Sequence, residues 1–281
     1  MSNELRIDHA TIAGPELAPM QEAFGRIGLK TEYGGVHANS VTHMALLGFD
    51  DGSYIELISV LRPGETDIPI WKGHILGEGG PCAWAVRCDD VNVEASRVSG
   101  LGVPVQGPYP QGRKTPAGVD VRWRFAFLGD QPAGAALPFV IQDVTPREYR
   151  VKVSPSVAGS ELVGVEIVVI GVNDLEAKVT LFRRLYHWCR PQTSSDDGLG
   201  ARLVYFPGTP VMLASPIAPG SWLATRLARF GESPCAFLIR TKDFRLSSKR
   251  SGLTPTSALF ERRVAWMDPG LLNGARLGLV E

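Results

Sequence analysis

The sequence predicts an α+β fold in which a β-α-β-β-β unit occurs four times, as tandem pairs in two related halves. Two internal repeats predict the duplication. The stretch PCAWAVR at residues 81–87 returns as PCAFLIR at residues 234–240, and IDHATIAG at residues 7–14 lines up with GVEIVVIG at residues 164–171. Both copies of the latter stretch precede a polar capping residue and an amphipathic helical pattern. The chain therefore divides into residues 1–150 and residues 155–281, with a short Pro/Ser linker between them.

The elements of the first half follow from their residue patterns. Apolar runs between turn residues predict strands, and the turn Asp50-Asp51-Gly52 between two such runs is a strong hairpin signal. The first unit is a strand at 5–13, a helix at 16–28, a Gly-rich connection at 34–40, and strands at 41–49 and 53–60. The second unit is a strand at 82–88, a helix at 90–101, and strands at 103–107, 119–128 and 137–144.

Composition excludes several classes of function. The 281 residues include 29 basic and 29 acidic side chains, so the chain lacks the basic excess that a sequence-independent nucleic-acid binder needs. No apolar run approaches the roughly 20 residues that span a bilayer, and no secretory signal pattern is present. Four scattered Cys form neither a disulfide framework nor a zinc motif. We expect a cytoplasmic protein that acts on a small molecule, with no nucleic-acid or membrane partner, and a homodimer stays open.

Two polar side chains interrupt apolar strands of the first unit. His9 lies in the middle of its strand, and Glu56 interrupts the run YIELI at residues 54–58. An ionised carboxylate inside a sheet is costly unless it is paired or binds a metal ion. His43 lies on the strand that forms the hairpin with the Glu56 strand. Because side chains alternate between faces, the hairpin register decides whether His43 joins the other two.

Two registers are open for this hairpin. If the turn closes on Phe49 and Tyr54, His43 shares the inner face with Glu56, whereas closure on Phe49 and Ser53 turns His43 outward. In the first register, two imidazoles and one carboxylate suit a divalent ion such as Zn, Fe(II), Mn or Ni and leave positions open for substrate. The alternative is a hydrogen-bonded, buried His–Glu pair without a metal. We expect the metal site.

A tandem β-α-β-β-β unit with a His on a first strand and a Glu on a last strand resembles the vicinal oxygen chelate superfamily, and within it the glyoxalase-like domain family. The residues that carry the resemblance lie in the first half: Ile7-Asp8-His9, Thr42-His43-Met44-Ala45-Leu46, Tyr54-Ile55-Glu56-Leu57-Ile58, Ala83-Trp84-Ala85-Val86-Arg87, Arg122-Trp123-Arg124 and Leu137-Pro138-Phe139. The second half is covered only through the internal repeat. The resemblance implies two glyoxalase-like halves with cupped mixed sheets, whose inner face carries a divalent metal and the substrate. It implies His9, His43 and Glu56 as the metal ligands here, with Glu56 also moving a proton.

The second half lacks most of these candidate ligands. The repeat aligns Glu166, Met212 and Leu203 with them, so one carboxylate and no His is kept. The one His of this half, His187, lies at the end of an expected helix. We interpret the second half as a degenerate copy that is structural or closes the site.

Further residues are candidates for contact with the substrate. An inward Arg87 or Arg124 would hold a carboxylate or phosphate by two hydrogen bonds, with Trp84 and Trp123 as walls. Both arginines recur in the second half, where no metal site is expected, and this favours a structural ion pair instead. The two interpretations stay open.

Three other polar residues are weaker candidates. His37 and His74 are expected to be ordinary loop residues, although loops near the mouth of a cup often carry function. Gln142 is expected at an exposed strand end.

The sequence supports three hypotheses about function. The first is a metal-dependent enzyme that acts on a small carbonyl or carboxylate compound by lyase or isomerase chemistry, with the metal as a Lewis acid. The second is a binding protein that sequesters a small molecule. The third is a ring-cleaving dioxygenase, which is disfavoured because all three candidate ligands fall within one unit. The superfamily hosts all three classes, so the fold does not decide between them.

Overall fold

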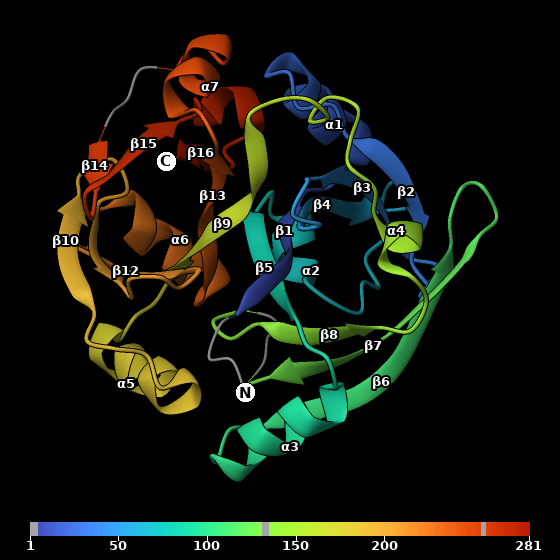
Figure 1. Ribbon diagram of the computed structural model, residues 1–281, viewed down its shortest axis with the longest axis horizontal. Coiled ribbons are helices and arrows are strands. Elements are labelled where there is room, and N and C mark those ends of the chain that lie inside the picture. Colours follow the sequence, from blue (N-terminus) through green and yellow to red (C-terminus); the bar gives the residue numbers. More distant parts are fainter. Residues whose placement is uncertain (1–4, 131–134, 254–256) are drawn as a thin grey trace.

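The protein folds into two curled mixed sheets, as Figure 1 shows. The computed structural model describes residues 5–130, 135–253 and 257–281. Each sheet has eight strands, the first built from residues 6–143 and the second from residues 162–280. Each sheet contains two β-α-β-β-β units, which confirms the α+β fold expected from the repeats.

The first sheet has the strand order β2-β3-β4-β1-β5-β8-β7-β6. Its elements are β1 (Arg6–Ala13), α1 (Leu17–Arg26), β2 (Glu32–Val36), β3 (Thr42–Gly48), β4 (Tyr54–Val60), α2 (Lys72–Leu76), β5 (Gly80–Arg87), α3 (Val91–Gly100), β6 (Val105–Lys114), β7 (Asp120–Leu128), β8 (Phe139–Asp143) and α4 (Arg147–Arg150). The first strands of the two units, β1 and β5, lie antiparallel at the centre of the sheet. Each is parallel to the last strand of its own unit, β4 or β8.

The second sheet repeats this order as β10-β11-β12-β9-β13-β16-β15-β14. Its elements are β9 (Leu162–Gly171), α5 (Leu175–Tyr186), β10 (Gln192–Asp196), β11 (Ala201–Tyr205), β12 (Val211–Pro216), α6 (Trp222–Phe230), β13 (Ser233–Thr241), α7 (Phe244–Arg250), β14 (Ser257–Leu259), β15 (Arg262–Trp266), the 3₁₀ helix η1 (Pro269–Leu272) and β16 (Leu277–Val280). None of the described helices is long and apolar enough to span a bilayer.

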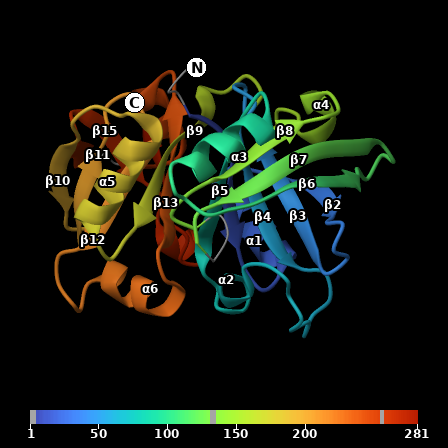
Figure 2. The ribbon, with the colours of Figure 1, turned by 90° about the horizontal axis from the view of Figure 1, so that it is seen from below.

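One apolar core joins the two sheets. Trp84 of the first sheet and Phe182 and Phe237 of the second half are fully buried in it. Figure 2 shows β13 next to β5, and the two strands are in contact. The backbone N–H of Val165 also donates to Ser53 Oγ across the boundary, at 2.9 Å. The outer surface of the first sheet is therefore packed, and its concave surface is left for a site.

Two elements differ from the sequence predictions. The Gly-rich connection contributes the strand β2, in which a Cβ on Gly34 would lie 2.8 Å from Met44 Cγ, so the glycine permits close pairing with β3. The sequence predicts a strand that ends at residue 107, yet β6 continues beyond it and pairs with β7 as far as Lys114. The ladder hydrogen bonds thus outweigh the Pro and Gly signals, and the longer strand brings Gln111 and Arg113 over the concave face.

Candidate active site

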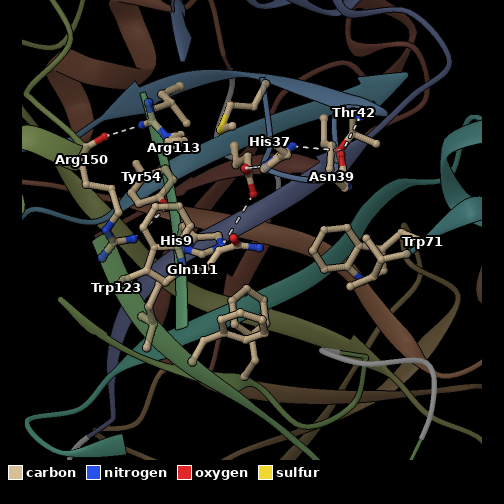
Figure 3. Close-up of a pocket in the computed structure, with 18 of the residues that line it drawn as sticks. His9, His37, Asn39, Thr42, Tyr54, Trp71, Gln111, Arg113, Trp123 and Arg150 are labelled. Carbon is tan, nitrogen blue, oxygen red and sulfur yellow. Dashed lines mark hydrogen bonds and ion pairs between the residues drawn. The ribbon is translucent and has the colours of Figure 1, made fainter. Parts of the chain in front are cut away.

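A cavity opens in the concave face of the first sheet, as Figure 3 shows. Its volume is about 790 Å³, including space at the mouth that is open to solvent. The wall is mainly apolar and aromatic, and its polar members are His9, His37, Asn39, Thr42, Tyr54, Glu56, Gln111, Arg113 and Arg150.

At the base of the site, Asp8 is fully buried and is held by two arginines of α4. Arg150 donates two hydrogen bonds to its carboxylate, at 2.8 and 2.7 Å, and Arg147 Nη1 donates another at 2.6 Å. Burial alone would raise the pKa of Asp8, but the charge and hydrogen bonds of Arg150, with a contribution from His9, hold it well below its usual value. Asp8 is therefore ionised and can only accept hydrogen bonds.

Asp8 fixes the tautomer of His9. His9 Nδ1 lies 2.7 Å from Asp8 Oδ1, so Nδ1 carries the proton. In the neutral ring, Nε2 then bears a lone pair. The ring stacks on Tyr54 with 4.7 Å between centroids, and the edge contact with Phe139 is at 5.1 Å. His9 is thus held in one orientation with its basic nitrogen in the cavity.

Glu56 lies opposite this nitrogen. Its Oε2 is 3.7 Å from His9 Nε2, which is beyond hydrogen-bond distance, and it accepts from Thr11 Oγ1 at 3.3 Å. Its Oε1 lies 3.1 Å from His37 Nε2. Burial opposes ionisation, but the hydrogen bond and charge of His37, then the charge of His9 and the hydrogen bond of Thr11, lower the pKa of Glu56 to about 2. When His9 is neutral, two acceptors, its Nε2 lone pair and the Glu56 carboxylate, face the same gap.

His37, which the sequence analysis expects to be an ordinary loop residue, lines the cavity and lies beside Glu56. It follows β2, and its backbone N–H donates to Thr42 O at 2.9 Å. Because the ionised Glu56 only accepts, His37 Nε2 carries the proton, and Nδ1 accepts from Thr42 Oγ1 at 2.9 Å. Asn39 Nδ2 donates to the same hydroxyl at 3.1 Å. With 22% of its side chain exposed, His37 connects Glu56 to the cavity mouth.

His43 does not join the site. The hairpin closes on Phe49 and Ser53, the second of the two registers, so His43 pairs with Ser59 and turns away from the face of Glu56. It packs edge-on against Tyr33, with 5.9 Å between ring centroids, and is not part of the cavity wall. The expectation that His43 shares the inner face is wrong, because the Asp-Asp-Gly turn takes the register that is one residue tighter.

The donor set does not fit the predicted metal site. Within residues 5–130, 135–253 and 257–281, no three His, Cys, Asp or Glu side chains are grouped so that they could hold a metal ion. In the second unit, the face that would supply further ligands carries Ala83, Ala85, Phe139 and Ile141, none of which coordinates a metal. The chemistry proposed below is therefore assigned to protein groups alone.

The predicted substrate-binding residues have different places. Trp123 lines the cavity, but Trp84 is fully buried in the core on the opposite face. Arg87 donates to the carbonyls of Ile7 and Asp51 outside the cavity. Arg124 is exposed on β7 and is not part of the wall.

The weaker candidates are structural. His74 lies in α2, stacks on Phe230 of the second half, and lies 3.4 Å from Ser233 Oγ. Burial, with the nearby charge of Arg226, lowers its pKa to about 4. Gln142 accepts from the backbone N–H of Val91 at the start of α3.

Among the described residues of the second sheet, the positions equivalent to Thr11 and Glu56 are apolar. Thr11 is aligned with Glu56 between β1 and β4, and the equivalent pair between β9 and β12 is Val169 with Met212. Val169 and Met212 are both buried in one apolar cluster. The polar positions of the first cup are thus apolar in the second, which supports its interpretation as a degenerate copy.

The strand registers also correct the alignment of Glu166. His9 lies opposite Ala85, whose equivalent in β13 is Leu238, and Leu238 lies opposite Ile167. Ile167 therefore takes the place of His9, and Glu166 takes that of the preceding residue, Asp8. Like Asp8, Glu166 pairs with two arginines, Arg240 at 3.1 Å and Arg262 at 3.0 Å.

Comparison with known proteins agrees with this architecture. A profile described as a glyoxalase-like domain matches residues 7–186, which is more than half of the chain. The chain belongs to the glyoxalase-like domain family. The resemblance noted from the sequence is thereby confirmed. No curated protein matches this member of the family.

Two solved structures share the fold of this glyoxalase-like protein along almost its whole length. A hypothetical protein from Staphylococcus aureus is 15% identical, with a TM-score of 0.63 and coverage of 98% of both chains. A triple mutant of 4-hydroxymandelate synthase from Streptomyces coelicolor is 14% identical, with a TM-score of 0.67 and coverage of 99% of this chain and 92% of that one. At these identities the likeness shows the fold alone.

Proposed function

We propose that the first cup is an active site that moves a proton on a small oxygenated substrate, in a reaction of the isomerase or lyase type. The observation that carries the proposal is the gap of 3.7 Å between the lone pair of His9 Nε2 and the carboxylate of Glu56. When His9 is neutral, neither group has a proton to give the other, so the gap is suited to receive one from a bound molecule.

The surrounding residues support each step of such a transfer. His9 Nε2 would take the proton from a C–H or O–H bond next to a carbonyl or carboxylate group. The imidazolium so formed lies between two carboxylates, Asp8 at 2.7 Å and Glu56 at 3.7 Å, and both stabilise its charge. Returning the proton to another atom gives an isomer, whereas expelling a leaving group gives a lyase product.

Glu56 and His37 provide a route for exchange of this proton with water. Glu56 lies beside the imidazoles of both His9 and His37. Of these three residues, His37 is the one that is partly exposed to solvent. The apolar wall on the other sides limits access of bulk water, which strengthens the electrostatic interactions inside.

Solvent deuterium tests this proposal. The protein would be incubated in D₂O with a panel of 2-oxo and 3-oxo carboxylates, and incorporation of deuterium would be followed by proton NMR. We expect incorporation at the position next to the carbonyl in at least one member. If compounds bind the cup but none exchanges, the protein is a binding module rather than an enzyme.

The metal content is measured on the same preparation. Protein purified without chelator is analysed for Zn, Fe, Mn and Ni, and exchange is repeated after dialysis against EDTA. We expect exchange to persist after the treatment. Loss of exchange that returns with one of these metals would reinstate the metal-dependent hypothesis.

A further inference from the structure

Two guanidinium groups line the cavity, and they differ in their partners. Arg150 has ion pairs with Asp8 and Asp143, each at 2.7 Å. Arg113 has no ion pair with any carboxylate of the described chain. Its Nη1 donates to the Gly34 carbonyl and its Nη2 to the Arg150 carbonyl, at 2.8 Å.

These contacts leave most of the hydrogen-bonding capacity of Arg113 unused. A guanidinium has five N–H donors, and two are engaged with the carbonyls in the part of the chain that is described. The two carbonyls hold the side chain at the end of β6 where it lines the cavity. Burial lowers the pKa of Arg113, and the nearby Arg150 acts in the same direction, whereas Tyr54 and Glu56 act in the opposite one. A ligand that brought a negative charge would therefore relieve an unpaired, partly desolvated cation.

The remaining wall restricts the body of that ligand. Besides the imidazoles, six aromatic side chains line the cavity: Tyr54, Trp71, Trp123, Phe125, Phe127 and Phe139. Figure 3 shows Arg113 and Trp123 on one side of His9 and Trp71 on the other. Flat apolar surfaces on both sides of the reactive nitrogen favour a planar apolar group over a sugar or a polar chain.

We propose that the cup binds a carboxylate with an aromatic or similarly flat apolar body, and that Arg113 holds the carboxylate group. The inference rests on the proposed function, because it names the substrate class of the same site. It places the charged group at Arg113, the apolar body between the aromatic side chains, and the atoms between them next to His9.

The test is a binding experiment with three probes: 3-phenylpropanoate, its amide 3-phenylpropanamide, and propanoate. Affinities are measured by isothermal titration calorimetry, with tryptophan fluorescence as a second readout because Trp71 and Trp123 line the cavity. We expect 3-phenylpropanoate to bind more tightly than either of the others. Equal affinity for the amide, or no binding of any probe, would overturn the proposal.

Variants assign the effect to Arg113. We expect Arg113→Gln to weaken binding of 3-phenylpropanoate by about 10- to 100-fold and to remove its advantage over the amide. Arg124→Gln, an exposed arginine on the neighbouring strand β7, is the matched control and should leave both affinities unchanged. Arg113→Lys keeps the charge without the planar fork, and should retain a reduced preference for the carboxylate. An unchanged preference in Arg113→Gln would contradict the inference.

Binding and catalysis can fail separately. Arg113-dependent binding without deuterium exchange would support the ligand class and remove the proposed enzyme. Deuterium exchange of a substrate whose affinity does not depend on Arg113 would support the proposed enzyme and contradict the proposed ligand class.

Discussion

The two cups of this protein share one strand plan and differ in what faces their inner surfaces. In the first cup, His9 and Glu56 line the cavity, and Thr11 donates a hydrogen bond to Glu56. In the second cup, the equivalent positions carry Ile167, Val169 and Met212, which are buried in apolar packing.

The two cups share a carboxylate paired with arginines, but His9 and Glu56 have no polar equivalents in the second cup. Asp8 and Glu166 occupy equivalent strand positions, and each is paired with two arginines. Asp8 is fully buried and also contacts His9, whereas the Glu166 side chain is 32% exposed and has no His beside it. Both cups thus contain a carboxylate paired with arginines. Only in the first cup is this carboxylate fully buried and in contact with a His.

The largest expected effect comes from breaking the buried cluster. Arg150→Met leaves Asp8 without its bidentate partner in a buried place, so we expect a loss of about 3–5 kcal/mol of unfolding free energy. The change Arg240→Met, which removes one of the two arginines beside Glu166, affects a half-exposed pair and should cost about 0–1 kcal/mol. Urea unfolding followed by circular dichroism measures both. Similar losses in the two variants would show that the clusters do not differ as described.

A smaller effect is expected from the pH dependence of Glu56. The pKa of this carboxylate is about 2 in the folded protein and near 4.5 when unfolded, so its stabilising contribution is complete above pH 4.5 and is lost as the pH falls through 2. The difference in unfolding free energy between wild type and Glu56→Gln should therefore shrink by about 3 kcal/mol between pH 5 and pH 2. Asp8 is present in both proteins, so its own contribution to the pH dependence of the unfolding free energy largely cancels in the difference.

Met212→Leu is the control for that measurement, because it changes the equivalent position of the second cup without a titrating group. Its difference from wild type should stay constant over the same pH range. A constant difference for Glu56→Gln as well would mean that Glu56 is not stabilised as an anion.

The smallest effect is expected at His43. Its side chain packs on Tyr33 outside the cavity, so His43→Ala should change the unfolding free energy by about 1 kcal/mol or less and leave binding of 3-phenylpropanoate unaltered. His37→Ala, in contrast, removes a cavity residue and should alter binding or exchange. If His43→Ala abolished exchange while His37→Ala did not, the outward register of the hairpin would be wrong.

The fold could be predicted from the sequence because the internal repeats indicate the duplication and the apolar runs between turn residues indicate the strands. PCAWAVR and PCAFLIR form the equivalent strands β5 and β13, and the Asp-Asp-Gly turn forms the expected hairpin. The family followed from the positions of His9 and Glu56 on β1 and β4. These are local patterns that a single chain displays directly.

The composition of the site was less predictable, because it depends on register and on contacts that are distant in sequence. A shift of one residue at the hairpin turned His43 outward, and nothing in the turn sequence decides between the registers. His37 resembles an ordinary loop residue, although the Asn39 and Thr42 around it are polar partners typical of a positioned side chain. Arg113 was assigned to no strand by its sequence, so its place over the cavity depended on the pairing of β6 with β7.

The central claim is that the polar groups of the first cup, and not the carboxylate of the second, move a proton. For the compound that exchanges fastest in D₂O, the rate is compared among wild type, His9→Gln, Glu56→Gln and the matched control Glu166→Gln. We expect a decrease of about 10²- to 10⁴-fold for the two changes in the first cup, as for loss of a general acid–base group, and an unchanged rate for Glu166→Gln. Exchange that persists in His9→Gln and Glu56→Gln, or that is lost in Glu166→Gln, would contradict the account.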